Sequence, residues 1–144
     1  MAQLIVPALA RVYDALRPFT EALIRLVAGL SLAAHGFPKL FADPTRTGEW
    51  FESIGWEPGL AWAIAVGLVE FVGGVCLALG LATRVVAVPI LVFLLTAIAH
   101  HWPSGFYWNI QGFEYPLFWA IVVFHFLVRG GGDWSIDAWF GREV

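Results

Sequence analysis

The sequence predicts an all-α membrane protein in which four transmembrane helices form one bundle. Of the 144 residues, 60% are hydrophobic and only 13% are charged, whereas soluble domains carry about a quarter charged residues. The mean hydropathy is +0.77. Four separate apolar segments approach the roughly 17–25 residues that a helix needs to cross a bilayer. The chain is short enough for these segments to form a single domain.

An amphipathic segment, residues 1–20, precedes the first span. Leu9 and Leu16 fall near helical spacing within it, whereas Arg11 and Arg17 are polar. Its apolar stretch is short and is followed, not preceded, by these arginines, which is unlike a cleaved signal peptide. We therefore expect this segment to lie on the membrane surface.

The transmembrane domain is predicted over residues 21–130. Its expected spans cover residues 22–41, 60–81, 85–101 and 115–128. The first two have the usual length, whereas the last two are short for a bilayer. We expect the aromatic lead-in at residues 106–108 to lengthen the fourth span, or a tilted or thinned arrangement to accommodate it. The Gly-rich stretch after residue 129 begins an interfacial C-terminal tail, residues 131–144.

The distribution of basic residues predicts the orientation in the membrane. If both termini face the same side, that side carries Arg11, Arg17, Arg25, Arg84, Arg129 and Arg142. The opposite side carries Lys39 and Arg46. Because cytoplasmic loops are enriched in basic residues, both termini are predicted to be cytoplasmic. Tryptophans cluster at both predicted boundaries, as in the aromatic belts of membrane proteins.

Several classes of function are excluded by composition and by motif. The formal net charge is -3 and the sequence has no basic stripe, so a nucleic-acid partner is not expected. Cys76 is the single cysteine, which rules out an internal disulfide or dithiol chemistry within this chain. No phosphate-binding glycine loop, haem-attachment motif or nucleophile elbow occurs.

The first span ends in a group of residues that lipid disfavours. His35 and Lys39 are four residues apart and share one helix face. Pro38 frees the carbonyl of Ala34 because it has no backbone N–H, and Gly36 permits a close backbone approach. The group can bind an anion or a quinone carbonyl, or serve a proton relay. The alternative is that Lys39 reaches the outer headgroups while His35 bonds a neighbouring helix.

Glu70 is the ionisable residue nearest the middle of the second span. Gly67 and Gly74 flank it and Gly73 is adjacent, so its face suits tight helix packing and directs the carboxylate into the bundle. An ionisable group at this depth is either functional or part of an interhelical ion pair. The candidate partners are His35, His125 and Arg25.

The histidines at the outer end do not predict a metal centre. His100, His101, His35 and Glu114 all converge on the outer half of the bundle, and imidazole and carboxylate are common ligands. Adjacent histidines on a helix diverge by about 100°, however, so both rarely bind one metal. We predict neither a bound metal nor a haem.

Three stretches resemble the DoxX family of small four-helix bacterial and archaeal membrane proteins. They are LIRLVAGLSLAAHGFPKLF, GLVEFVGGVCLALGLATR and GFEYPLFWAIVVFHFLVRGGGDWSIDAW. The resemblance runs from about Glu21 to Ala138. Its marks are Arg25, His35-Gly36, Lys39, Glu70, Gly73-Gly74, Thr83-Arg84, His100 and Glu114-Tyr115-Pro116.

The resemblance implies a role in quinone-linked electron transfer in a bacterial or archaeal cell (inner) membrane. The family takes its name from a subunit associated with a thiosulfate:quinone oxidoreductase, and other relatives are membrane partners in redox complexes. The expected partners are lipids and other membrane subunits or further copies of the chain.

Site roles follow from the polar groups and the resemblance together. The expected catalytic residues are Glu70 and His35; the expected ligand-binding residues are Lys39, His100, Glu114 and Tyr115; the expected structural residues are Arg25, Gly73, Gly74, Arg84 and Pro38. The alternative is a non-catalytic scaffold or accessory subunit of a larger complex. A solute pathway ranks below both because the sequence has no inverted repeat.

Overall fold

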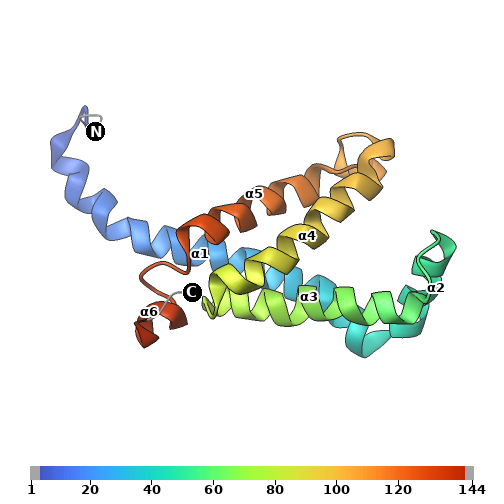
Figure 1. The fold of residues 1–144 in the computed structure, drawn as a ribbon. Coiled ribbons are helices and arrows are strands. Elements are labelled where there is room, and N and C mark those ends of the chain that lie inside the picture. Colours follow the sequence, from blue (N-terminus) through green and yellow to red (C-terminus); the bar gives the residue numbers. More distant parts are fainter. Residues whose placement is uncertain (1–3, 142–144) are drawn as a thin grey trace.

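The computed structural model describes residues 4–141, and this part of the chain is helical without β-strands (Figure 1). The six α-helices are α1 (Ala10–Phe37), α2 (Pro44–Ser53), α3 (Gly59–Leu79), α4 (Thr83–His101), α5 (Glu114–Arg129) and α6 (Ile136–Phe140). A π-helical turn covers Pro38–Ala42, and short 3₁₀ turns cover Pro7–Leu9, Trp102–Ser104 and Trp108–Ile110. The all-helical prediction is confirmed.

Within residues 4–141, two helices are long and apolar enough to cross a membrane. They are α3, with 21 residues, and α4 with the turn that follows it, with 22 residues. They coincide with the predicted spans at residues 60–81 and 85–101. Gly80 ends α3 in the left-handed conformation at φ 68°, which is the usual way for glycine to terminate a helix.

The first helix is longer than the predicted span. It begins at Ala10 and passes through Pro18 without interruption, so residues 10–20 of the expected surface segment form the first turns of α1. Figure 1 shows this part of α1 turning away from the other helices. A proline inside a helix removes one hydrogen bond and bends the axis. Residues 1–3 of the segment and residues 142–144 of the tail lie outside the described residues.

Glycines bring α1 and α3 into backbone contact. A Cβ placed on Gly36 would lie 2.4 Å from the backbone nitrogen of Phe71, and one on Gly29 would lie 2.4 Å from the carbonyl oxygen of Gly74. The approach is reciprocal, because a Cβ on Gly74 would lie 2.6 Å from the carbonyl oxygen of Gly29. Small residues at such positions allow two helices to pack at the shortest distance. This glycine contact fixes the register of α1 against α3.

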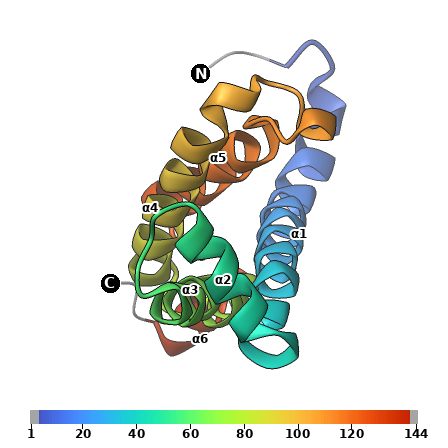
Figure 2. The same cartoon turned by 90° about the vertical axis from the view of Figure 1, so that its right-hand side faces the viewer.

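The remaining core lies where α3, α4 and α5 meet. Its fully buried side chains include Leu77, Ile90, Val123 and Phe126. Gly73 belongs to this side of α3, since a Cβ there would lie 3.2 Å from Ile90. The main helices thus contact one another in the order α1, α3, α4, α5, and α1 meets α5 only sparsely. Figure 2 shows α1 standing apart from α5.

The helical assembly has two different ends, the Arg129 end and the Lys39 end. At the Arg129 end, α3 and α5 finish, α4 begins and α6 folds back. At the Lys39 end lie the π-helical turn, α2 and the connection between α4 and α5.

Two expectations at the Lys39 end are corrected by the structure. The segment between the first two predicted spans, in which no helix was predicted, contains α2, because Pro44 starts the helix and Asp43 Oδ1 accepts the backbone N–H of Arg46 at 3.0 Å. Residues 106–108 do not lengthen the fourth helix. The chain reverses there, since Gly105 has φ 85° and the N–H of Glu114 donates to the carbonyl of Phe106 at 3.0 Å.

Candidate functional site

A cleft of about 450 Å³ lies between α1 and α5 toward the Lys39 end, and all four long helices line it. Its lining includes Ser31 and His35 from α1, Glu70 from α3, Phe93 and His101 from α4, and Tyr115 and Trp119 from α5. Of the predicted site residues, the structure brings His35, Glu70 and Tyr115 to this cleft. The cleft is bordered by α1 and α5, which make few contacts with each other.

An ion pair closes one wall of the cleft. The ammonium of Lys39 lies 2.5 Å from Glu70 Oε2, and the Glu70 side chain is only 5% exposed. The same ammonium donates to the carbonyl oxygen of His35 at 2.9 Å. The expected partners of Glu70 were His35, His125 and Arg25, so the structure corrects that expectation. A buried carboxylate needs an opposite charge this close to offset its desolvation.

Local backbone geometry carries Lys39 over Glu70. Lys39 belongs to the π-helical turn that starts at Pro38, and the N–H of Asp43 closes this turn on the carbonyl of Pro38 at 3.0 Å. A Cβ on Gly67 would lie 2.8 Å from Leu40 and 3.2 Å from Lys39 Cβ. The wider turn and the glycine together let the side chain of Lys39 reach across to α3.

His101, not His100, is the α4 histidine of the cleft. It follows Phe93 and Ala97 at intervals of four residues, and both of these also line the cleft, so all three share one helix face. His101 Nδ1 lies 2.8 Å from the carbonyl oxygen of Gln111. To choose His101 from its helical spacing, one must know which face of α4 turns toward α1. The sequence does not give this information.

Three predicted ligand-binding residues, Lys39, His100 and Glu114, are not part of the cleft lining, and Lys39 reaches the cleft only through its ion pair with Glu70. The ring of His100 makes an edge contact with Trp50 at a centroid distance of 5.4 Å. Glu114 Oε2 accepts the backbone N–H of Trp108 at 3.1 Å and so stabilises the reversal before α5. Within residues 4–141, no three His, Cys, Asp or Glu side chains are grouped so that they could hold a metal ion.

Arg25 joins three segments at the Arg129 end. Its Nε donates to the carbonyl of Ala78 at 3.4 Å, its Nη2 to the carbonyl of Trp134 at 2.6 Å, and its Nη1 to the carbonyl of Gly131. Arg25 is buried, with 3% of its surface exposed. Three carbonyl acceptors satisfy a guanidinium that lipid would otherwise penalise. Arg25 thereby holds the C-terminal tail against α1 and α3.

Asp137 is a structural residue that sequence reasoning missed. Its carboxylate accepts the N–H of Ala82 at 2.7 Å, the N–H of Thr83 at 2.9 Å and the hydroxyl of Thr83 at 2.8 Å. Ala82 itself has no side chain that could cap α4. In the sequence, no capping residue precedes this helix. This absence could have indicated that another segment supplies the cap.

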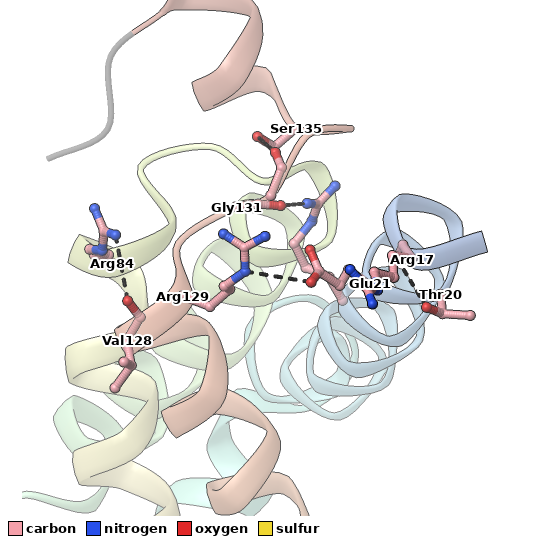
Figure 3. Close-up of polar contacts among 10 residues, drawn as sticks. Arg17, Thr20, Glu21, Arg84, Val128, Arg129, Gly131 and Ser135 are labelled. Atoms are coloured by element: carbon pink, nitrogen blue, oxygen red, sulfur yellow. Dashed lines mark hydrogen bonds and ion pairs between the residues drawn. The ribbon is translucent and has the colours of Figure 1, made fainter. Parts of the chain in front are cut away.

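Further polar contacts surround the end of α5. Figure 3 shows Arg129 directed toward Glu21 and Arg84 directed toward Val128. Arg129 Nε lies 3.5 Å from Glu21 Oε1, and Arg84 Nη2 lies 3.5 Å from the carbonyl oxygen of Val128. These contacts connect α5 to α1 on one side and to α4 on the other. They place the predicted structural residue Arg84 far from the cleft.

Comparison with known proteins links most of the chain to one family. The family model described as DoxX matches residues 21–102. A Mycobacterium tuberculosis protein named "Uncharacterized membrane protein Rv3486" is 33% identical over 144 residues, covering 91% of this chain and 87% of the relative. A Bacillus subtilis protein named "Putative oxidoreductase CatD" is 38% identical over 115 residues, covering 80% and 82%. No solved structure matches the chain significantly.

Proposed function

The chain belongs to the DoxX family of membrane proteins, and on that premise we propose that it is the membrane subunit of a quinone-linked redox system. The quinone head group occupies the cleft between α1 and α5. Electrons are exchanged with a partner subunit, because the chain carries no cofactor motif of its own. The name of the Bacillus subtilis relative supports an oxidoreductase role.

The observation that carries this proposal is the pairing of aromatic walls with a buried ion pair. Phe93, Tyr115 and Trp119 supply flat apolar surface around the cleft, and its volume of about 450 Å³ falls within the usual range of ligand pockets, about 300–1,000 Å³. His35 from α1 and Glu70 from α3 line the same cleft. This combination suits a ring that is apolar on its faces and has a hydrogen-bonding oxygen at its edge.

The chain's own residues would orient the ring and handle protons. A quinone accepts two electrons and two protons when it is reduced to the quinol. The imidazole of His35 can donate a hydrogen bond to a ring oxygen and exchange a proton with it. The Lys39–Glu70 pair adjoins His35, since Lys39 also contacts the carbonyl of His35. His35 and Glu70 therefore have the proton-transfer roles in this proposal, and Lys39 and Tyr115 position the ligand.

We propose further that all four long helices cross the bacterial inner membrane with the Arg129 end in the cytoplasm. The 16 residues of α5 give a rise of about 24 Å, less than the hydrocarbon thickness of about 30 Å, so the bilayer thins around α5. Cysteine labelling tests this orientation in a Cys76→Ala background. Ser53→Cys should react with a membrane-impermeant reagent in intact cells, and Asp133→Cys only after permeabilisation. The reverse pattern would exclude this topology.

Ligand binding is tested with the purified protein in lipid nanodiscs and a short-chain quinone as the probe. We expect the double variant His35→Ala/Glu70→Gln to bind the quinone at least tenfold more weakly. His100→Ala is the matched control, because it also removes an imidazole but lies outside the cleft lining. Quinol turnover is then compared in native membranes that contain the partner subunits. Unchanged binding and turnover in the double variant would refute the proposal.

A non-catalytic accessory role is the second candidate, and the aromatic surface at the Lys39 end favours it. Trp102, Tyr107 and Trp108 are 63%, 65% and 56% exposed in the connection between α4 and α5. Aromatic residues of this size are enriched in interfaces between proteins. Copurification from native membranes separates the candidates: an accessory subunit keeps its partner when the cleft is disabled by His35→Ala/Glu70→Gln and loses it when this aromatic surface is changed.

A further inference from the structure

A groove of about 650 Å³ lies beside α5 at the Arg129 end, away from the cleft. Its lining consists of Ile121, Phe124, His125, Val128 and Arg129 from α5 and of Arg84 from α4. The α5 residues recur at intervals of three and four, so they form one continuous stripe along the helix. The groove thus has an apolar floor and two guanidinium groups at one end.

The apolar stripe is open to its surroundings. Ile121, Phe124 and Val128 are 61%, 55% and 65% exposed. The seven-residue separation of Ile121 and Val128 corresponds to a length of about 10 Å. A stripe of this length accommodates the first part of an acyl chain.

In the proposed membrane orientation, the basic residues would lie where a bilayer changes from hydrocarbon to headgroups. Arg84 is in the first turn of α4 and Arg129 is the last residue of α5. His125 is four residues before Arg129 and therefore one helical turn deeper on the same face. Along the groove, the order of guanidinium, imidazole and apolar side chains matches the order of phosphate, ester and acyl chain in a phospholipid.

The chemistry at the basic end of the groove suits phosphate. The ion pair of Arg129 with Glu21 uses Nε, at 3.5 Å from Glu21 Oε1, and Figure 3 marks no interaction of the two terminal nitrogens of Arg129 with the residues drawn. The groove lining, as described, includes no acidic side chain. Guanidinium groups bind phosphate oxygens through paired, charge-assisted hydrogen bonds.

We propose that this groove is a binding site for an anionic glycerophospholipid. Arg84 and Arg129 bind its phosphate, His125 donates a hydrogen bond to an ester oxygen, and an acyl chain packs along Ile121, Phe124 and Val128. Basic pockets between transmembrane helices on the cytoplasmic side are suited to anionic headgroups. The site depends on the Arg129 end lying at a bilayer surface and is independent of the redox role, because no residue of the groove lines the cleft.

The test compares lipids of identical acyl chains added to the delipidated full-length protein in detergent. Dioleoyl phosphatidylglycerol should raise the melting temperature more than dioleoyl phosphatidylcholine, and native mass spectrometry should show preferential retention of the former. In Arg84→Gln/Arg129→Gln we expect this preference to fall at least fivefold. Arg11→Gln/Arg17→Gln is the matched control, since it removes the same charge from α1 outside the groove, and it should retain the preference.

Two further variants separate lipid binding from the structural contacts of the arginines. Glu21→Gln removes the ion pair of Arg129 but keeps both guanidinium groups, so the preference should persist or increase. Phe124→Ser keeps both arginines and should weaken phosphatidylglycerol retention, which also provides the decisive test if the double arginine variant does not fold. Undiminished retention of phosphatidylglycerol in Phe124→Ser would overturn the proposal. Equal stabilisation by inorganic phosphate would overturn it as well, since the groove would then take a free anion.

Discussion

Lys39 and Glu70 form an ion pair of 2.5 Å between the end of α1 and the middle of α3. The pair stands directly beside the closest contact of these helices, where a Cβ on Gly36 would also meet Glu70 Cβ at 2.9 Å. The close approach of α1 to α3 at Gly36 and the ion pair between Lys39 and Glu70 therefore depend on one another. The ion pair has a structural role whether or not a ligand occupies the cleft.

Replacing Lys39 with Met should strongly destabilise the protein. The substitution keeps the approximate length of the side chain but leaves Glu70 without its cation, and breaking a buried pair from one side costs about 3–5 kcal/mol. The free energy of unfolding in a detergent titration measures the loss. The double variant Lys39→Met/Glu70→Gln should recover most of it, because no unpaired charge remains. A single variant as stable as the wild type would show that the pair contributes nothing.

Adding one methyl group at Gly36 should separate α1 from α3. The new Cβ would lie 2.4 Å from the backbone nitrogen of Phe71, which a side-chain movement cannot relieve, and overpacking of this kind costs about 1–3 kcal/mol or more. We expect a lower melting temperature for Gly36→Ala. Ala34→Leu on the exposed side of the same helix is the control and should be nearly neutral. Equal melting temperatures for the two variants would contradict the close approach.

Replacing Arg25 should release the C-terminal tail. Arg25→Lys preserves the charge but cannot donate to three carbonyls as the guanidinium does, and each hydrogen bond to a charged group is worth about 1.5–3 kcal/mol. Hydrogen exchange of residues 131–137 should accelerate in this variant. Arg17→Gln, an exposed arginine of the same helix, should leave the exchange of the tail unchanged. Full protection of the tail in Arg25→Lys would argue against its role as the link.

Removing the carboxylate of Asp137 should fray the start of α4. Loss of a helix N-cap costs about 0.5–2 kcal/mol, and here the cap also binds the hydroxyl of Thr83. In Asp137→Ala, the amides of Ala82 and Thr83 should exchange faster with solvent. Asp133→Ala, a neighbour in the same tail, serves for comparison. Unchanged exchange at both amides would mean that another group caps α4.

The helices could be predicted from the sequence because hydropathy and length carry that information locally. Glycine and proline mark the boundaries of α3, and the predicted span at residues 60–81 differs from the helix by only one or two residues at each end. The early start of α1 was missed because residues 1–20 were predicted as a separate surface segment, whereas in the structure the helix continues through Pro18. The helix α2 was missed because its residues are polar and were interpreted as a connecting loop.

The candidate site was less predictable, since it depends on which helix faces meet. Convergence of His35 and Glu70 was expected from their depths alone. The pairing of Glu70 with Lys39 was not, because it requires the π-helical turn after Pro38 and the short distance at Gly36. The choice of His101 over His100 depends on the rotation of α4, which a nearly uniformly apolar helix does not reveal in its sequence.

The contacts of Arg25 set an order of events during biosynthesis. This arginine belongs to α1, yet two of its three acceptor carbonyls, those of Gly131 and Trp134, lie 106 and 109 residues later in the sequence. Until the tail arrives, the guanidinium depends on Ala78 and on solvent. Insertion of the helices can therefore proceed in sequence, but the contacts of Arg25 are complete only after residues 131–134 have been synthesised. A chain truncated before residue 131 would leave a buried cation exposed to recognition by membrane quality control.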